Sequence, residues 1–186
     1  MEPLLDALTA ALGPYLGVPF AFFGHSLGAT ICYELAQRLR LEGRNGPVQL
    51  LVAARRAPHV PSVDTPVYNL SDAEFRRRLR ELGGTPDDVL DDAELMEVIE
   101  PMLRADFEVN DTYGPSDNPP LDCPISAFGA SHDRAVPREH LEAWREATRV
   151  SFRLNMIPGD HFSIMGEQAG LVEGVARELQ LILKGR

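Results

Sequence analysis

Long apolar runs are missing from this chain, and no segment approaches the about 18 consecutive apolar residues that a membrane-spanning helix requires. Cysteine is scarce as well. Cys32 and Cys123 stand far apart, without the short spacing of a metal site, so we expect two buried free thiols. The first dozen residues lack the basic start and apolar centre of a signal peptide. These absences favour a protein of the reducing cytoplasm that binds neither a membrane nor a metal.

Basic residues are in the minority. The chain has 18 Lys and Arg against 28 Asp and Glu, and its formal net charge is −10. A surface of this sign repels phosphate backbones, which disfavours a general role in binding nucleic acid. The 186 residues, 44% apolar and 25% charged, suffice for one globular domain with a proper core, and we expect a single domain over residues 1–186.

Residues 24–28 read Gly-His-Ser-Leu-Gly and lie between two different patterns. The apolar run from Pro19 to Phe23 predicts a buried strand, and a helical spacing of apolar residues follows the motif at once. A G-x-S-x-G between a strand and a helix is typical of a sharp turn that exposes a nucleophilic serine. We expect both glycines to let the strand and the helix approach without side-chain clashes. Ser26 is therefore the candidate nucleophile, and the backbone N–H of Leu27 is the candidate oxyanion donor.

Strands and helices alternate along most of the chain. Further strands are predicted at residues 48–54 and 123–129, and residues 152–157 are expected to form a fourth strand. Helical spacing predicts helices at residues 2–12, from the motif to about 41, at 137–147 and at about 167–183. The strand at 48–54 lacks polar alternation, as a parallel strand covered on both faces should, and strands alternating with helices indicate an α/β fold: a parallel sheet with helices on both faces.

Residues 71–113 depart from this alternation. Helical patterns cover 71–82 and 91–106, a short one begins at Thr85, and no strand is expected among them. We expect a helical lid insertion over about residues 66–115 that closes over the site as a mobile cap. The alternative is that this segment is an additional packing layer.

Two residues complete the predicted chemistry. A serine hydroxyl needs a base to take its proton, and the base needs an acid that fixes its tautomer. In open α/β sheets such groups follow the carboxyl ends of strands. Asp133 follows the strand at 123–129, His161 follows the strand at 152–157, and the order serine, acid, histidine is that of α/β-hydrolases. The predicted catalytic residues are Ser26, Asp133 and His161.

Other histidines and aspartates compete for these two roles. His25 lies inside the turn and is expected to point sideways, while His132 precedes the acid in the wrong order. The remaining competitors lie in exposed segments, in the insertion, at the wrong end of a strand or beside His161, and they are His59, His140, Asp106, Asp122 and Asp160.

Five segments together resemble the type II thioesterases of polyketide and nonribosomal peptide assembly lines. They are residues 22–29, 55–59, 82–86, 103–107 and 159–162, and the resemblance extends over essentially the whole chain. It implies an α/β-hydrolase-type fold and an enzyme that hydrolyses acyl groups from the phosphopantetheine thiol of acyl or peptidyl carrier proteins, with no cofactor of its own. The family's triad falls on Ser26, Asp133 and His161.

The chain departs from the family pattern in its first residues. The resemblance implies an N-terminal segment with the first strands and a glycine-rich loop that supplies the second oxyanion donor. We find no counterpart here, so we expect an N-terminally truncated sheet and a second donor that is absent from this chain. Asp160 stands where the family usually has glycine, and Arg134 where proline is common.

The resemblance also bears on partners. We expect a monomer that meets a carrier protein, and basic residues are available to attract an acidic partner: Arg55, Arg56, Arg76, Arg77, Arg78 and Arg80. The last four are equally compatible with a solvated helix face. Two other functions stay open, namely an esterase or medium-chain acyl hydrolase acting on small substrates, and a catalytically inactive truncated homologue.

Overall fold

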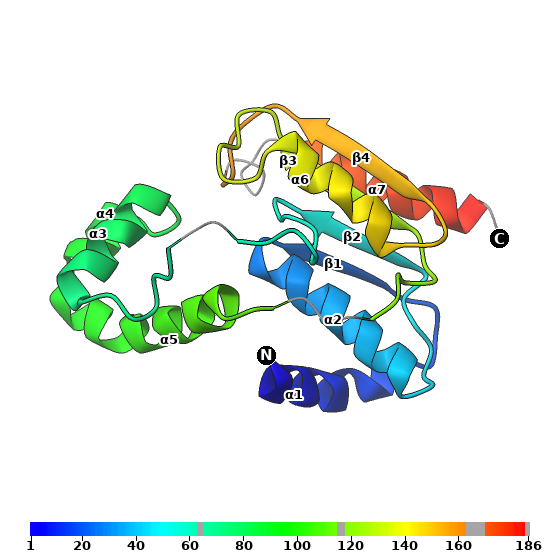
Figure 1. Ribbon diagram of the computed structural model, residues 1–186, viewed down its shortest axis with the longest axis horizontal. Coiled ribbons are helices and arrows are strands. Elements are labelled where there is room, and N and C mark those ends of the chain that lie inside the picture. Colours follow the sequence, from blue (N-terminus) through cyan, green and yellow to red (C-terminus); the bar gives the residue numbers. More distant parts are fainter. Residues whose placement is uncertain (63–64, 115–117, 163–169, 185–186) are drawn as a thin grey trace. The chain divides into compact units, whose positions relative to one another are not determined.

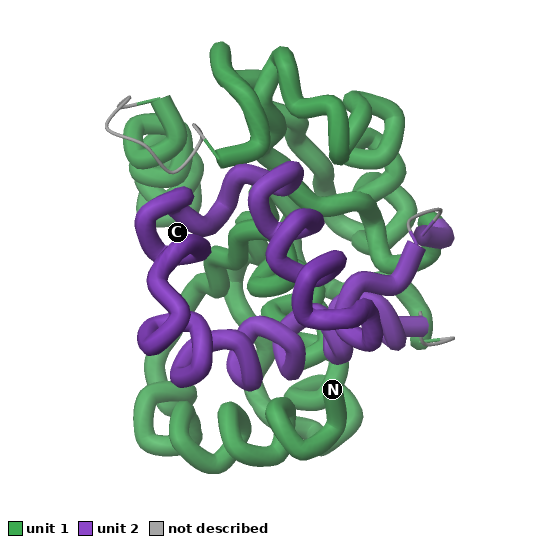
Figure 2. Tube along the Cα trace, turned by 90° about the vertical axis from the view of Figure 1, so that its left-hand side faces the viewer, with its two compact units in different colours: residues 1–60, 115–186 green, residues 61–114 purple. Residues whose placement is uncertain are grey.

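The structure is a computed structural model that describes residues 1–62, 65–114, 118–162 and 170–184. The chain divides into two compact units, coloured separately in Figure 2. Unit 1 comprises residues 1–60 and 115–186, and unit 2 comprises residues 61–114. The bounds of unit 2 lie close to those of the expected insertion. Its action as a lid stays a prediction.

Unit 1 contains a four-stranded sheet, seen at the right of Figure 1. Its strands are β1 (Ala21–His25), β2 (Gln49–Ala53), β3 (Ile125–Ala130) and β4 (Phe152–Ile157). They lie in the order β1-β2-β3-β4, and every pair is parallel. The expected parallel α/β sheet is therefore confirmed. β4 has the predicted bounds, whereas β1 continues two residues further than predicted, to His25.

Helices follow the strands as the apolar spacing predicts. They are α1 (Glu2–Leu12), the short 3-10 turn η1 (Gly13–Tyr15), α2 (Leu27–Leu41), α6 (Arg138–Glu142), the 3-10 segment η2 (Ala143–Ala147) and α7 (Gly170–Lys184). The single helix predicted at 137–147 is thus an α-helical turn that tightens into a 3-10 segment. The predicted start of the last helix, at about 167, lies outside the described residues. Among the described helices, none is both long and apolar enough to cross a membrane.

Helices pack against both faces of the sheet. On one face Tyr33 of α2 and Trp144 of η2 pack with Val52 and other small apolar residues of the strands. On the other face Leu171 of α7 packs against Phe128 and its neighbours. All residues of β2 are buried, which explains why its sequence shows no polar alternation. Packing against the core and the strand register therefore hold the carboxyl ends of the strands side by side.

Unit 2 is built from three helices with a core of their own. They are α3 (Asp72–Leu82), α4 (Asp87–Asp91) and α5 (Ala93–Asp111), and their core residues are Val67, Phe75, Leu79, Leu90 and Met96. The helix predicted to end at residue 106 continues to Asp111. The local spacing of apolar residues does not predict this extension. The end of α5 is bonded to distant residues: the carboxylate of Asp111 accepts the backbone N–H groups of Val67 and Tyr68, more than 40 residues away.

The arginines of unit 2 are matched by carboxylates. Residues 61–114 contain 14 Asp and Glu but only 5 Arg. The arginines of α3 pair with nearby carboxylates: Arg76 with Glu100, Arg77 and Arg78 with Glu81, and Arg80 with Asp87 and Asp91. The arginine cluster is thus largely neutralised within unit 2, which favours a structural role on the helix surface over a free basic docking patch.

Candidate active site

The turn at Ser26 has the backbone of a nucleophile elbow. Ser26 has a φ of 49° and a ψ of −122°, a region that residues other than glycine rarely adopt. Its N–H donates to the carbonyl of Ala53 at 2.8 Å, and its own carbonyl accepts the N–H of Ala29 at 3.0 Å. The sheet and the first turn of α2 therefore hold this strained residue between them.

A second strained residue lies beside the first. Ala54, with a φ of 51°, is the other non-glycine residue at positive φ in the described chain. Because His25 and Ala53 are register partners, Ser26 and Ala54 leave neighbouring strands at the same level. The next residue, Arg55, is buried, and its Nε–H donates to Oγ1 of Thr30 in α2 at 2.8 Å. The exit of β2 is thereby tied to the helix that follows Ser26.

The two glycines of the motif differ in what they allow. A Cβ on Gly24 would lie 2.3 Å from the carbonyl oxygen of Gly28 and 2.5 Å from the nitrogen of Ala29. A Cβ on Gly28 would have no atom within 4 Å among the described residues. The expected steric need for glycine therefore holds at Gly24. At Gly28 the prediction was wrong, because its contribution to the close approach is its backbone, which faces Gly24, and a Cβ on Gly28 itself would meet nothing among the described residues.

Asp133 and His161 lie in contact at the carboxyl ends of β3 and β4. Nδ1 of His161 is 2.8 Å from Oδ2 of Asp133, and the side chain of Asp133 is only 1% exposed. The other carboxylate oxygen accepts the N–H groups of Ala135 at 2.8 Å and Val136 at 3.0 Å. An Nδ1–H that donates to a carboxylate leaves Nε2 of the neutral ring as the free, basic nitrogen.

The surroundings of Asp133 favour its ionised form. Burial on its own raises the pKa of this carboxyl group. The hydrogen bond and the charge of His161, with the backbone N–H groups of Val136 and Ala135, outweigh burial and lower the pKa below its ordinary value. Asp133 is therefore a carboxylate at neutral pH, able to orient the ring of His161 and to stabilise it when it is protonated.

Ser26 is linked to this pair through its neighbour. Nε2 of His25 lies 3.3 Å from the carbonyl oxygen of His161, and the two rings are 5.5 Å apart. In the described residues no hydrogen bond joins Ser26 to the ring of His161, a situation common in enzymes without bound substrate. The turn at Ser26 and the Asp133–His161 pair therefore lie at the same edge of the sheet, where the strands end. His25 contacts the loop that carries His161.

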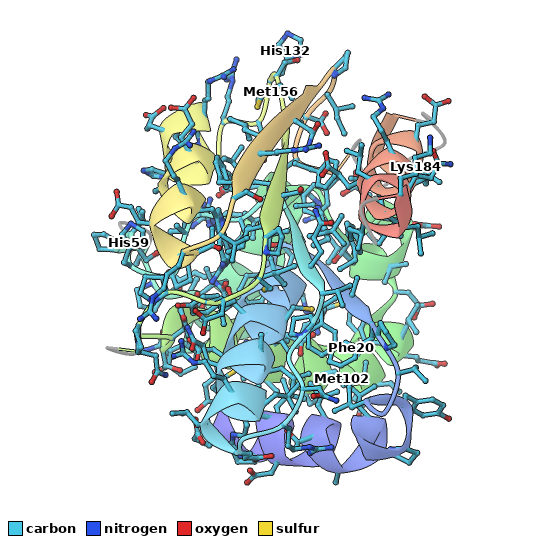
Figure 3. The ribbon with its side chains drawn as sticks, turned by 90° about the vertical axis from the view of Figure 1, so that its right-hand side faces the viewer. Phe20, His59, Met102, His132, Met156 and Lys184 are labelled. Carbon is cyan, nitrogen blue, oxygen red and sulfur yellow. The ribbon has the colours of Figure 1, made fainter. Side chains whose placement is uncertain are left out.

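The competing histidines and aspartates lie elsewhere or bind other groups. The exposed ring of His132 extends from the tip of the loop after β3 (Figure 3). Nε2 of His59 lies 3.4 Å from Glu146, and Asp122 lies near Arg149 at the amino end of β3. The carboxylate of Asp160 accepts the N–H of Phe162. None of these contacts offers a second acid–histidine pair beside Ser26.

The start of α2 supplies a donor for developing negative charge. Leu27 is the first residue of α2, so its N–H belongs to the group of first-turn donors that have no acceptor within the helix. Such N–H groups, at the positive end of the helix, favour an anion. Leu27 stays the predicted oxyanion donor, and the predicted lack of a second donor stays a prediction too.

Together these features define a class of enzyme. A parallel sheet, a strand that turns into a helix at a positive-φ serine, and an aspartate–histidine pair beyond later strands are the attributes of an α/β-hydrolase-type fold. Residues 1–182 match the family model described as "Thioesterase domain". The chain therefore belongs to the thioesterase domain family and is a hydrolase of thioesters.

Named biosynthetic proteins and thioesterases are similar to this chain. The gramicidin S biosynthesis protein GrsT of Aneurinibacillus migulanus is 40% identical over 183 residues, covering 98% of this chain and 72% of GrsT. The structure of the type II thioesterase BorB from the borrelidin biosynthetic cluster is 35% identical, with a TM-score of 0.84, over 96% of this chain and 72% of BorB. The medium-chain S-acyl fatty acid synthase thioesterase of Rattus norvegicus is 32% identical over 168 residues, 87% of this chain and 62% of that protein. The resemblance to type II thioesterases is confirmed.

Proposed function

We propose that this thioesterase releases acyl groups from the phosphopantetheine thiol of acyl or peptidyl carrier proteins during polyketide or nonribosomal peptide biosynthesis. The similarity to GrsT and BorB supports this substrate class. The observation that carries the chemistry is the buried Asp133, hydrogen-bonded to His161 at the sheet edge where Ser26 forms its strained turn. The enzyme needs no cofactor, because the reaction requires only a nucleophile, a proton carrier and water.

In the proposed mechanism His161, oriented by Asp133, takes the proton of the Ser26 hydroxyl as Oγ attacks the thioester carbonyl. The backbone N–H of Leu27 donates to the oxyanion of the tetrahedral intermediate. When the intermediate collapses, the carbon–sulfur bond breaks, and the protonated His161 returns its proton to the departing thiolate. His161 then takes a proton from water, the resulting hydroxide attacks the acyl-serine, and the released Ser26 recovers its proton.

The reaction is assigned to a reducing cytoplasm. Cys32 and Cys123 are free cysteines, and burial raises the pKa of each thiol to about 11, so both stay protonated and unreactive at neutral pH. Free thiols of this kind persist where glutathione keeps the compartment reduced. The partner is a carrier protein, and the enzyme acts as a monomer.

The decisive experiment uses a carrier protein loaded with an acetyl-phosphopantetheine arm, with deacylation followed by intact mass. We expect release by this chain and loss of release in Ser26→Ala. Ser151→Ala is the matched control, since Ser151 is an exposed serine that precedes β4, at the amino end of the sheet. Deacylation by Ser26→Ala at the unaltered rate would contradict the assignment of the nucleophile, and no release by the unaltered chain would support the inactive homologue.

The similarity to the rat medium-chain thioesterase supports medium-chain acyl groups as an alternative acyl preference, and small thioesters are the alternative carrier. That alternative is the hydrolysis of medium-chain acyl groups from small thioesters. An octanoyl thioester of free pantetheine and the same octanoyl group on a carrier protein distinguish the two. We expect a much higher kcat/KM for the carrier-bound group, and equal values for both substrates would favour the alternative.

A further inference from the structure

His25 has no role in the proton transfers described above, although it precedes Ser26 directly. Its Nε2 lies 3.3 Å from the carbonyl oxygen of His161, and the planes of the two rings are inclined by 54°. The contact joins residues that are 136 positions apart in the sequence. It connects the main chain of the proposed base to the strand that carries the proposed nucleophile.

The strand geometry explains why His25 points toward His161. Successive side chains of a strand face opposite sides of the sheet. Gly24 faces α2, since a Cβ added there would meet the backbone of Gly28 and Ala29. His25 must therefore face the other side, which α7 covers. The chain leaving β4 carries His161 on its way to α7, and so it passes the ring of His25.

The loop after β3 binds the segment that carries His161. The N–H of His132 donates to the carbonyl of Gly159 at 2.8 Å, and Asp133 binds the ring of His161. Both bonds come from the loop after β3. β2 separates β3 from β1, which places them roughly 10 Å apart at the usual strand spacing. His25 provides a bond to this segment from β1 itself.

We propose that His25 is a positioning residue, whose Nε2–H holds the main-chain carbonyl of His161 and thereby keeps the imidazole of His161 within reach of Ser26. This inference rests on the proposed roles of Ser26 and His161. His25 exchanges no proton with the substrate. Its effect is exerted entirely through the placement of His161.

The electrostatic setting suits a neutral donor. Burial, the main cause, lowers the pKa of His25 below its ordinary value, and the neighbouring His161 contributes in the same direction, against the hydrogen bond to the His161 carbonyl and the charge of Asp133. A neutral His25 with its proton on Nε2 donates to a carbonyl without placing a second positive charge beside His161. The imidazolium that forms during the reaction is then not opposed by its neighbour.

Two substitutions distinguish the contribution of the N–H donor from that of the aromatic ring. His25→Phe keeps a flat ring and removes the donor, whereas His25→Gln places an amide N–H near the position of Nε2. The measurements are kcat and KM for thioester hydrolysis and the rate at which a fluorophosphonate labels Ser26. We expect His25→Phe to lower kcat and the labelling rate about 10- to 100-fold with KM nearly unchanged, as for a displacement of about 1 Å in a catalytic group. His25→Gln should recover most of the rate.

A background without the base tests whether His25 acts through His161. In His161→Ala, the further change His25→Phe should leave the residual hydrolysis unaltered, because there is no imidazole left to position. The same fold-loss in both backgrounds, or no loss in His25→Phe, would overturn the inference. Full activity of His161→Ala or Ser26→Ala would instead overturn the proposed function. If His25→Phe does not fold, His25→Asn replaces it. Its shorter amide cannot reach the carbonyl of His161, so we expect its kcat and labelling rate to fall as predicted for His25→Phe, while His25→Gln keeps most of the rate.

Discussion

Replacing Gly24 by alanine tests the close approach of β1 and α2 most directly. The added methyl group would lie 2.3 Å from the Gly28 oxygen and 2.4 Å from its carbonyl carbon, whereas non-bonded heavy atoms attract at about 3.5–4.0 Å. All three nearest atoms belong to the backbone, so no side chain can move aside. The first turn of α2 must shift by about 1 Å or more to restore ordinary contact.

This shift has two measurable consequences. Overpacking of a well-filled site typically costs about 1–3 kcal/mol, so the free energy of unfolding in urea should fall by that amount. A displacement of about 1 Å at Ser26 should lower the rate of fluorophosphonate labelling, and of thioester hydrolysis, roughly 100-fold. The loss of rate should exceed what the small unfolded fraction explains, because labelling is measured where the variant remains folded.

Gly28→Ala is the matched control from the same motif. Its methyl group would meet no described atom within 4 Å, and alanine favours a helix over glycine by roughly 0.5–1 kcal/mol. We expect Gly28→Ala to keep the unfolding free energy or raise it slightly, with labelling of Ser26 within a few-fold of the unaltered chain. Equal behaviour of the two variants in both assays would refute the assignment of the steric constraint to Gly24.

Three further predictions concern the acid, the core and unit 2. The pKa of Asp133 is lowered on folding, so its contribution to stability is present above the unfolded-state value of 3.8 and is lost as pH falls further. Urea unfolding at pH 5 and pH 3 should therefore show an acid-side decline that is smaller in Asp133→Asn, which should also reduce kcat by about 100-fold or more. Trp144→Phe removes the indole donor to the carbonyl of Arg55 and should lower the unfolding free energy by about 1–3 kcal/mol, and an unchanged urea midpoint would contradict the importance of this bond. Glu100→Gln weakens the buried contact with Arg104 in unit 2, and hydrogen exchange should become faster in residues 61–114 while the strands of unit 1 keep their protection.

Local sequence patterns predicted the elements that carry the candidate site. The strand predicted at residues 152–157 is β4 with its observed bounds, although Arg153 and Asn155 interrupt its apolar residues and none of its residues is fully buried. The strand predictions also placed Asp133 and His161 after the last two strands. Parallel strands share one carboxyl edge, so residues in separate loops after these strands are expected to lie close together, and Asp133 and His161 do.

Contacts between distant segments limited the rest of the prediction. The orientation of His25 follows from the alternation after Gly24, but the sequence does not reveal which loop crosses that face of the sheet. The extension of α5 to Asp111 depends on two N–H groups at Val67 and Tyr68. The pairing of Arg76 with Glu100 spans two helices, which is why the arginine cluster could be interpreted both as a docking patch and as a structural face.

The division of the chain into two units bears on whether the turn at Ser26 persists when unit 2 unfolds locally. The amide of Ser26 is bonded to Ala53 inside the sheet of unit 1, and the described residues of 61–114 contribute no strand to that sheet. Unit 2 keeps a small core of its own, so it can lose its structure in a partial opening that leaves the sheet bonded. Substitutions that loosen unit 2 therefore need not disturb the backbone of the nucleophile.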